Sequence, residues 1–183
     1  MTTLLRLAAA FALLATLAGA SVAPASAQSA GTFRFEKEFL GRTVAFGRFR
    51  TITGVDRRFR VDLNGTWNGR TLKLVERFRF DDGERDTKIW YFTKTGPGRY
   101  TGRRSDVDGV AKVRVRGNVA RYGYRLFLNE KERSNAVYFR DRMVKRADGT
   151  ILNTALVFKG PLPVGRVKVV FGRPKDVGRL ERP

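Results

Sequence analysis

Three polar residues lie where a β-strand pattern expects apolar ones. Glu76 falls on the same face as the leucines and phenylalanines of residues 71–80. Asp141 likewise falls on the same face as the apolar side chains of residues 137–143. Asn153 is a third, weaker case. Because residues i and i+2 of a strand share a face, all three are predicted to point inward. A buried carboxylate is unfavourable unless it is paired or hydrogen-bonded, so these positions mark either a polar network or a ligand pocket.

Both interpretations stay open at this point. In a structural network, the three groups would bond to tyrosine hydroxyls or to an inward arginine such as Arg121, or a bulge would turn them outward. In a ligand site, Glu76, Asp141 and Asn153 would line a pocket together with Trp90. Two facing carboxylates also suit glycosidase-type hydrolysis. No third element supports that chemistry, and we expect a non-enzymatic protein with no catalytic residues.

The composition excludes several kinds of site. The 183 residues contain no Cys and no His. This rules out disulfides, thiolate nucleophiles, Ser-His-Asp triads, Cys/His zinc sites and histidine switches. The acidic residues at 81–82 and 106–108 lack the spacing of an EF-hand loop and are typical of hairpin turns. We therefore expect no metal and no cofactor.

The first 27 residues are predicted to be a secretory signal peptide. Arg6 provides a short positive region, residues 7–20 form an apolar run, and Ala25-Ser26-Ala27 is an A-x-A cleavage site. The run is short for a membrane span, although an uncleaved N-terminal anchor is the alternative. No Cys follows it, so no lipid anchor is expected. The sequence predicts a periplasmic or secreted protein that begins near Gln28.

The strong positive charge has to be interpreted together with export. Lys and Arg number 37 against 17 Asp and Glu, which gives a formal net charge of +20. In a cytosolic domain this excess would first suggest nucleic acid. For an exported chain we expect no nucleic-acid partner, and an anionic envelope surface becomes the natural candidate.

Residues after Phe33 show period-two alternation broken by turn signals every eight to twelve residues. Almost no helical periodicity is present. We predict one β domain over residues 28–171 and a basic C-terminal tail over 172–183. The expected strands are residues 43–51, 58–63, 71–80, 88–92, 99–103, 107–116, 121–128, 135–146, 151–158 and 164–171.

Short hairpin connections make these strands sequential antiparallel neighbours. Nine or ten such strands must curl or split into two layers. We predict an all-β, lipocalin-like, up-and-down barrel, with a β-sandwich as the alternative. A porin-like membrane barrel is disfavoured, because charged residues alternate onto the face that would meet lipid. We therefore do not expect a transmembrane protein.

Several short runs carry a resemblance to a known family, between about residues 39 and 171. These runs are 65–69, 74–78, 81–84, Trp90, 100–102, 106–109, 117–118, Phe139 with Asp141 and Met143, Asn153, 159–160 and 164–165. Together they resemble a family of uncharacterised exported, lipoprotein-like proteins of Gram-negative bacteria, known as a domain of unknown function. The resemblance implies a lipocalin or calycin barrel and no assigned activity.

Glu76, Asp141 and Asn153 match the family pattern. The chain departs from it by lacking the lipobox Cys, by Arg142 where an aromatic residue is usual, and by Arg140 where an acid is common.

The function expected from the sequence is to bind a hydrophobic or amphiphilic, lipid-like ligand inside the barrel. The alternative is a structural or adaptor protein whose basic surface docks on anionic lipid, lipopolysaccharide or an acidic partner. A cavity beside Glu76 and Asp141 favours the first function, and a filled interior favours the second.

Overall fold

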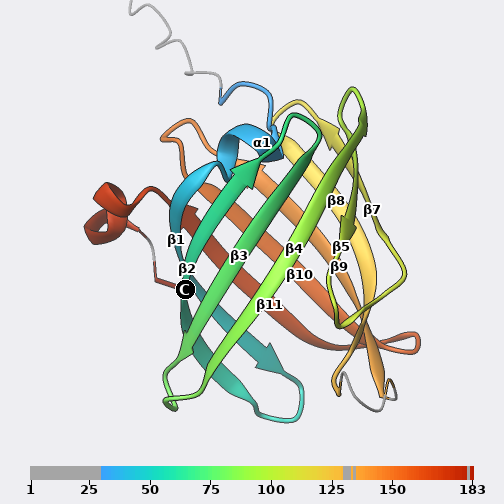
Figure 1. Ribbon diagram of the computed structural model, residues 1–183. Coiled ribbons are helices and arrows are strands. Elements are labelled where there is room, and N and C mark those ends of the chain that lie inside the picture. Colours follow the sequence, from blue (N-terminus) through green and yellow to red (C-terminus); the bar gives the residue numbers. More distant parts are fainter. Residues whose placement is uncertain (1–29, 130–132, 134, 181) are drawn as a thin grey trace, which may run out of the picture.

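The computed structural model (Figure 1) describes residues 30–129, 133, 135–180 and 182–183; the predicted signal peptide lies outside them. A one-turn helix precedes a series of strands, and a 3-10 helix follows them. The elements in chain order are α1 (Phe35–Glu38), β1 (Gly41–Thr51), β2 (Asp56–Trp67), β3 (Thr71–Phe80), β4 (Arg85–Gly96), β5 (Arg99–Arg103), β6 (Val107–Asp108), β7 (Ala111–Arg116), β8 (Val119–Phe127), β9 (Ala136–Lys145), β10 (Ile151–Lys159), β11 (Leu162–Gly172) and η1 (Pro174–Arg179).

The strands form one closed antiparallel barrel. Each strand pairs with the next along the chain, apart from the short β6, and β11 returns to pair with β1 from Val44↔Gly172 to Thr51↔Gly165. Within the described residues ten strands close the ring, and the two residues of β6 add to it beside β8. The prediction of an all-β up-and-down barrel is confirmed. The β-sandwich alternative is wrong, because pairing of the first and last strands leaves a single sheet without free edges.

The alternation in the sequence accounts for the two faces of the wall. In β2, Val61 and Leu63 are buried in the interior, whereas the alternate residues Arg60 and Asp62 lie on the outer face. The predicted strand 107–116 is interrupted in the structure, which divides it into β6 and β7. Gly109 lies between the two at a φ of +72°, a backbone conformation that glycine adopts without strain.

Helix α1 closes one end of the barrel and was not predicted, because four residues are too few to show helical periodicity. It brings Phe35 into the core beside Phe33 and Phe39, and all three rings are almost completely buried. The helix backbone comes so close to β2 that a side chain on Gly65 would collide with the Phe39 carbonyl oxygen. We call this the capped end, and Figure 1 shows α1 lying across it.

The opposite end, which we call the open end, is packed less tightly. It is bordered by the β1–β2, β3–β4 and β10–β11 hairpins. Inward-facing aromatic residues near this end keep part of their surface exposed although they point into the barrel. They are Phe49, Phe59, Phe78, Phe80, Tyr124 and Phe139.

After β11 the basic tail folds back onto the barrel. Leu180 is buried and packs against Gly172, and the guanidinium of Arg182 lies over the Phe46 ring. In the described part of the chain, no helix is long and apolar enough to cross a membrane.

Candidate functional site

The three misplaced polar residues and Trp90 all face the interior. Asp141, Asn153 and Trp90 are buried, and Glu76 lies on the inner face of β3 between Leu74 and Phe78. They come from four strands, β3, β4, β9 and β10, and the barrel closure brings them together. The register pairs Leu74 with Trp90 across β3 and β4, and Met143 with Asn153 across β9 and β10.

A short hydrogen bond joins two of these residues. The Asn153 amide Nδ2 donates to Asp141 Oδ1 at 2.6 Å. The other oxygens, Asp141 Oδ2 and Asn153 Oδ1, are buried and have no hydrogen-bond partner among the described residues. Buried acceptors without partners are rare in folded proteins and call for an explanation. Both could accept a hydrogen bond from a bound molecule or from an ordered water.

The interior raises the pKa of both carboxyl groups. Burial raises the pKa of Glu76 to about 7, with the charges of Asp106 and Asp141 acting in the same direction and Arg104 opposing them. Burial likewise raises the pKa of Asp141 to about 7, against the hydrogen bond from Asn153, the charge of Arg104 and the nearby Tyr124 hydroxyl. Near neutral pH both acids are therefore partly protonated.

A buried ion-pair network supports the site, and the sequence analysis missed it. The Arg104 guanidinium donates to Asp106 through Nε at 2.5 Å and through Nη2 at 3.1 Å, and it lies 4.8 Å from the centre of the Trp90 ring. Lys88 reaches the same carboxylate at 3.2 Å. The sequence did contain a signal for Arg104, because it is the next residue in the period-two alternation that places Tyr100 and Gly102 inside the barrel.

The suggestion that Arg121 enters this network is wrong. Arg121 is exposed on the outer face of β8, whereas its neighbours Ala120 and Tyr122 occupy the inner positions. Two tyrosine hydroxyls do lie in the interior: Tyr122 donates to the Met143 sulfur at 3.8 Å, and the Tyr124 hydroxyl lies beside Asp141. Burial raises the pKa of both hydroxyls well above the ordinary range, so they stay protonated.

These groups form a polar layer across the middle of the barrel. Along β3, Leu72 and Leu74 lie on its capped side, and Phe78 and Phe80 lie on its open side. Arg104 and Lys88, the inward cations of this layer, both bind Asp106, and Glu76 and Asp141 make no ion pair with any described residue. Among the described residues, no group of three or more acids is arranged to hold a metal ion.

Comparison with known proteins identifies the family. The model of a family described as "Protein of unknown function (DUF3833)" matches residues 12–173. The chain belongs to the DUF3833 family. The expected membership of a domain of unknown function is thereby confirmed. No curated protein was found that matches this DUF3833 chain.

Solved structures resemble the DUF3833 chain in fold alone. An S-type phycobiliprotein lyase from Guillardia theta is similar over 75% of this chain and 88% of its own, with a TM-score of 0.52 and 8% identity. A redesigned β-barrel bound to DFHBI is similar over 77% of this chain and all of its own, with a TM-score of 0.40 and 8% identity. The likeness to the lyase agrees with a lipocalin-like barrel, and at this identity it shows nothing about function.

Proposed function

We propose that the protein binds a small amphiphile inside the barrel, with the apolar body in the open half and a hydrogen-bond-donating head group at the polar layer. The observation that carries this proposal is the pair of buried acceptors, Asp141 Oδ2 and Asn153 Oδ1, which lack donors among the described residues. A ligand hydroxyl or amine placed between them would supply the missing donor.

The open half of the interior suits the apolar body. Phe59, Phe78 and Phe80 pack together with ring centroids 5.6–5.9 Å apart, and each remains partly exposed. Burying exposed aromatic surface against an apolar ligand is favourable at about 25 cal/mol per Å². The tightly filled capped end offers no comparable surface, so the ligand enters from the open end.

The charges of the polar layer select the head group. Glu76 and Asp141 have no ion pair in the part of the chain that the structure describes, and their negative charge disfavours a carboxylate or a phosphate beside them. An amine is favoured most when both acids are ionised, above pH 7. An alcohol binds without this pH dependence, because it carries no charge.

The test uses three probes of equal chain length: dodecylamine, dodecanol and dodecanoate. Binding is followed by the fluorescence of Trp90 in a Trp67→Phe variant, which removes the other tryptophan. We expect dodecylamine and dodecanol to bind at least tenfold more tightly than dodecanoate. Dodecylamine should bind more tightly at pH 8 than at pH 6.

Matched variants locate the binding. Asp141→Asn should weaken dodecylamine at least tenfold while changing dodecanol less than about threefold. Asp108→Asn, an exposed acid on β6, is the control and should change neither. Two outcomes would overturn the proposal. One is equal affinity for all three probes. The other is that protein purified from its native cells carries no amphiphile and binds none of the probes.

The remaining expectations belong to the same proposal. The protein acts as a binder without catalysis, in a Gram-negative cell envelope, after export and removal of residues 1–27. Amino-terminal sequencing of the protein from periplasmic and culture fractions tests this. A mature protein beginning near Gln28 in those fractions supports export, and an intact amino terminus in the cytosol contradicts it.

A further inference from the structure

The outer face of strands β7 to β11 carries many cations and no acidic residue of its own. Asp141 is the sole acidic residue in these strands, which the structure describes in full, and it points inward. Several outward cations make no ion pair with any described residue. They are Lys112, Arg114, Arg121, Arg140, Arg142 and Arg166.

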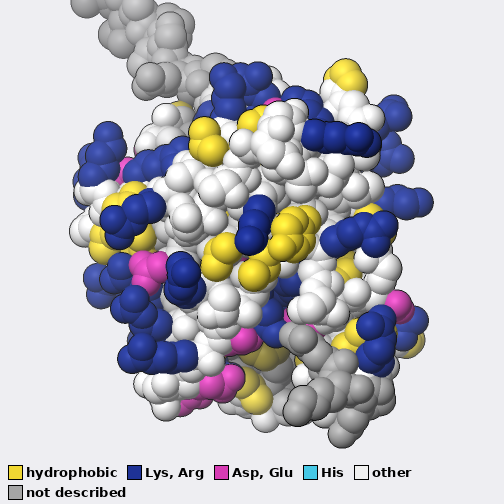
Figure 2. Space-filling model, in the orientation of Figure 1, with side chains coloured by type: hydrophobic (Ala, Val, Ile, Leu, Met, Phe, Trp, Pro, Cys, Tyr) yellow, Lys and Arg dark blue, Asp and Glu magenta, His cyan; other side chains and the backbone are white. Residues whose placement is uncertain are grey.

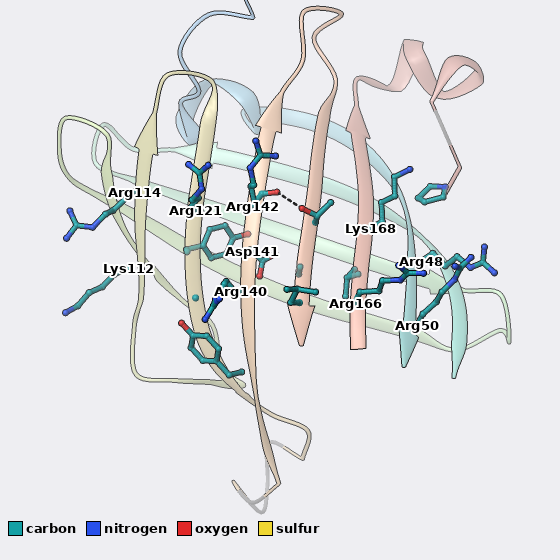
Figure 3. A pocket seen from close by; sticks show the side chains of 18 of the residues that line it. Arg48, Arg50, Lys112, Arg114, Arg121, Arg140, Asp141, Arg142, Arg166 and Lys168 are labelled. Atoms are coloured by element: carbon teal, nitrogen blue, oxygen red, sulfur yellow. Dashed lines mark hydrogen bonds between the residues drawn. The ribbon is translucent and has the colours of Figure 1, made fainter. Parts of the chain in front are cut away.

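The barrel register places these cations next to one another. Arg114 lies opposite Arg121, and Arg121 lies opposite Arg142 on the next strand. Like charges directly opposite in a sheet are destabilising. Figure 3 shows these side chains on successive strands. They line a surface pocket of about 1270 Å³. The arrangement weakens the isolated barrel, and an anionic partner would remove that repulsion.

The opposite wall differs in this respect. There Asp62 lies between Arg60 and Arg79 at 2.9 and 2.8 Å, and Arg57 is paired with Asp82 and Glu84. On the face seen in Figure 2, acidic side chains lie among the basic ones. Cations such as Lys73 and Arg77 on this wall also make no ion pair with any described residue, but acidic side chains lie among them. Strands β7 to β11 differ because they carry no outward acidic residue.

Exposed apolar side chains border the charged wall at the open end. Ile52 is 75% exposed and Leu162 is 65% exposed, at the tips of two hairpins that a hydrogen bond from Ile52 N to Val164 O holds together. Leu156, 46% exposed, has Arg140 and Arg166 as its direct cross-strand neighbours. We call Ile52, Leu156 and Leu162 the apolar rim.

The combination identifies the partner. A soluble polyanion would contact the cations and gain nothing from exposed leucine and isoleucine side chains. A lipid bilayer with anionic head groups offers phosphates for the arginines and an apolar interface for the rim. We propose that the open end of the barrel, on its β9–β11 side, docks on an anionic lipid bilayer. This goes beyond ligand binding and is independent of the interior.

The test measures flotation of the protein, as purified from cells, with vesicles of 30% phosphatidylglycerol in phosphatidylcholine. Each arginine near an anionic surface strengthens binding about fivefold. The charge variant, Arg140→Gln with Arg166→Gln, should therefore lower binding at least tenfold. The matched control, Lys73→Gln with Arg77→Gln on β3, removes the same charge from exposed positions elsewhere and should lower it less than threefold.

A second pair of variants tests the apolar rim. Ile52→Ser with Leu162→Ser should lower vesicle binding about tenfold. Leu40→Ser, at an exposed leucine beside the capped end, should leave it unchanged. Thermal melting of each variant shows that it is folded.

Three outcomes would overturn the proposal. One is absence of vesicle binding by the unaltered protein, and another is an equal loss in the charge variant and its control. The third is inorganic polyphosphate displacing the vesicles while the rim variant binds normally, which would assign the wall to a soluble polyanion. Asp141→Asn should not affect flotation, so failure of the interior site and failure of docking are distinguishable.

Discussion

The two ends of the barrel use the same kinds of residue and pack them differently. At the capped end Phe33, Phe35 and Phe39 are almost fully buried, because α1 fills the interior. At the open end Phe59 and Phe78 also point into the barrel, but part of each side chain remains exposed. The capped end is built for stability. The open end keeps apolar surface available, which is what a ligand site requires.

The largest expected effect tests this contrast directly. Phe35→Ala should lower the free energy of unfolding by about 3–5 kcal/mol, because it leaves a cavity among closely packed rings. Phe78→Ala in the open half should lower it by about 1–2 kcal/mol, since that ring is already partly solvated. Urea denaturation of both variants checks the difference. Equal losses would mean that the two ends are packed alike.

The polar layer between the two ends supplies the next prediction. Arg104→Ala should lower the free energy of unfolding by about 3 kcal/mol, because it leaves the buried Asp106 with a single cation, Lys88. Arg103→Ala, one residue earlier and exposed, is the control and should change it by less than about 0.5 kcal/mol. If both variants lost equal stability, the layer would not be a closed interior network.

The pH dependence of stability is the third prediction. Glu76 and Asp141 have a pKa of about 7 in the folded chain, above the ordinary carboxyl value. Such acids take up protons on folding, so the free energy of unfolding falls as the pH rises from about 4.5 to 7. The fall should be on the order of a few kcal/mol.

Asp141→Asn removes one of these acids and should make the pH profile flatter. Above pH 7 the variant should be at least as stable as the unaltered protein, because no charge is then buried at this position. Denaturation at pH 5 and pH 8 measures the slope. An unchanged slope would show that Asp141 does not titrate in this range.

The smallest effect concerns the outer surface. Arg142→Gln removes a cation directly opposite Arg121 and should raise the free energy of unfolding by about 0.5 kcal/mol. Loss of an outer arginine would then stabilise the barrel, whereas loss of the interior Arg104 destabilises it. This difference would separate charges that hold the fold from charges that are available to a partner. A loss of stability would instead indicate a structural role for Arg142.

The sequence predicted the barrel and the inward acids for the same reason. Period-two alternation determines which face a side chain occupies, and it placed Glu76, Asp141 and Asn153 correctly inside. It could not reveal α1, which is one turn long and is held by tertiary packing. Arg104 lay one residue beyond the predicted end of its strand, and Arg121 was assigned inward against its own alternation.

The sequence also could not show which basic residues lie on the proposed docking surface and which are paired with acids on the opposite side of the barrel. Basic residues occur along the whole chain, and which of them meet a carboxylate depends on strand register and hairpin geometry. Asp62 reaches Arg79, seventeen residues away, only because β2 and β3 pair in that register. The charge count was known in advance, and its distribution between the walls required the structure.

The pairing of β1 with β11 has a consequence for how the chain folds. Val44 and Gly172 are neighbours in space although they are far apart in the sequence, so the ring closes after nearly the whole domain has been synthesised. Until then β1 and the most recently formed strand are open edges that can pair with other chains. A nascent or truncated chain without β11 should therefore aggregate. Ring closure is the step that makes this sheet safe from aggregation.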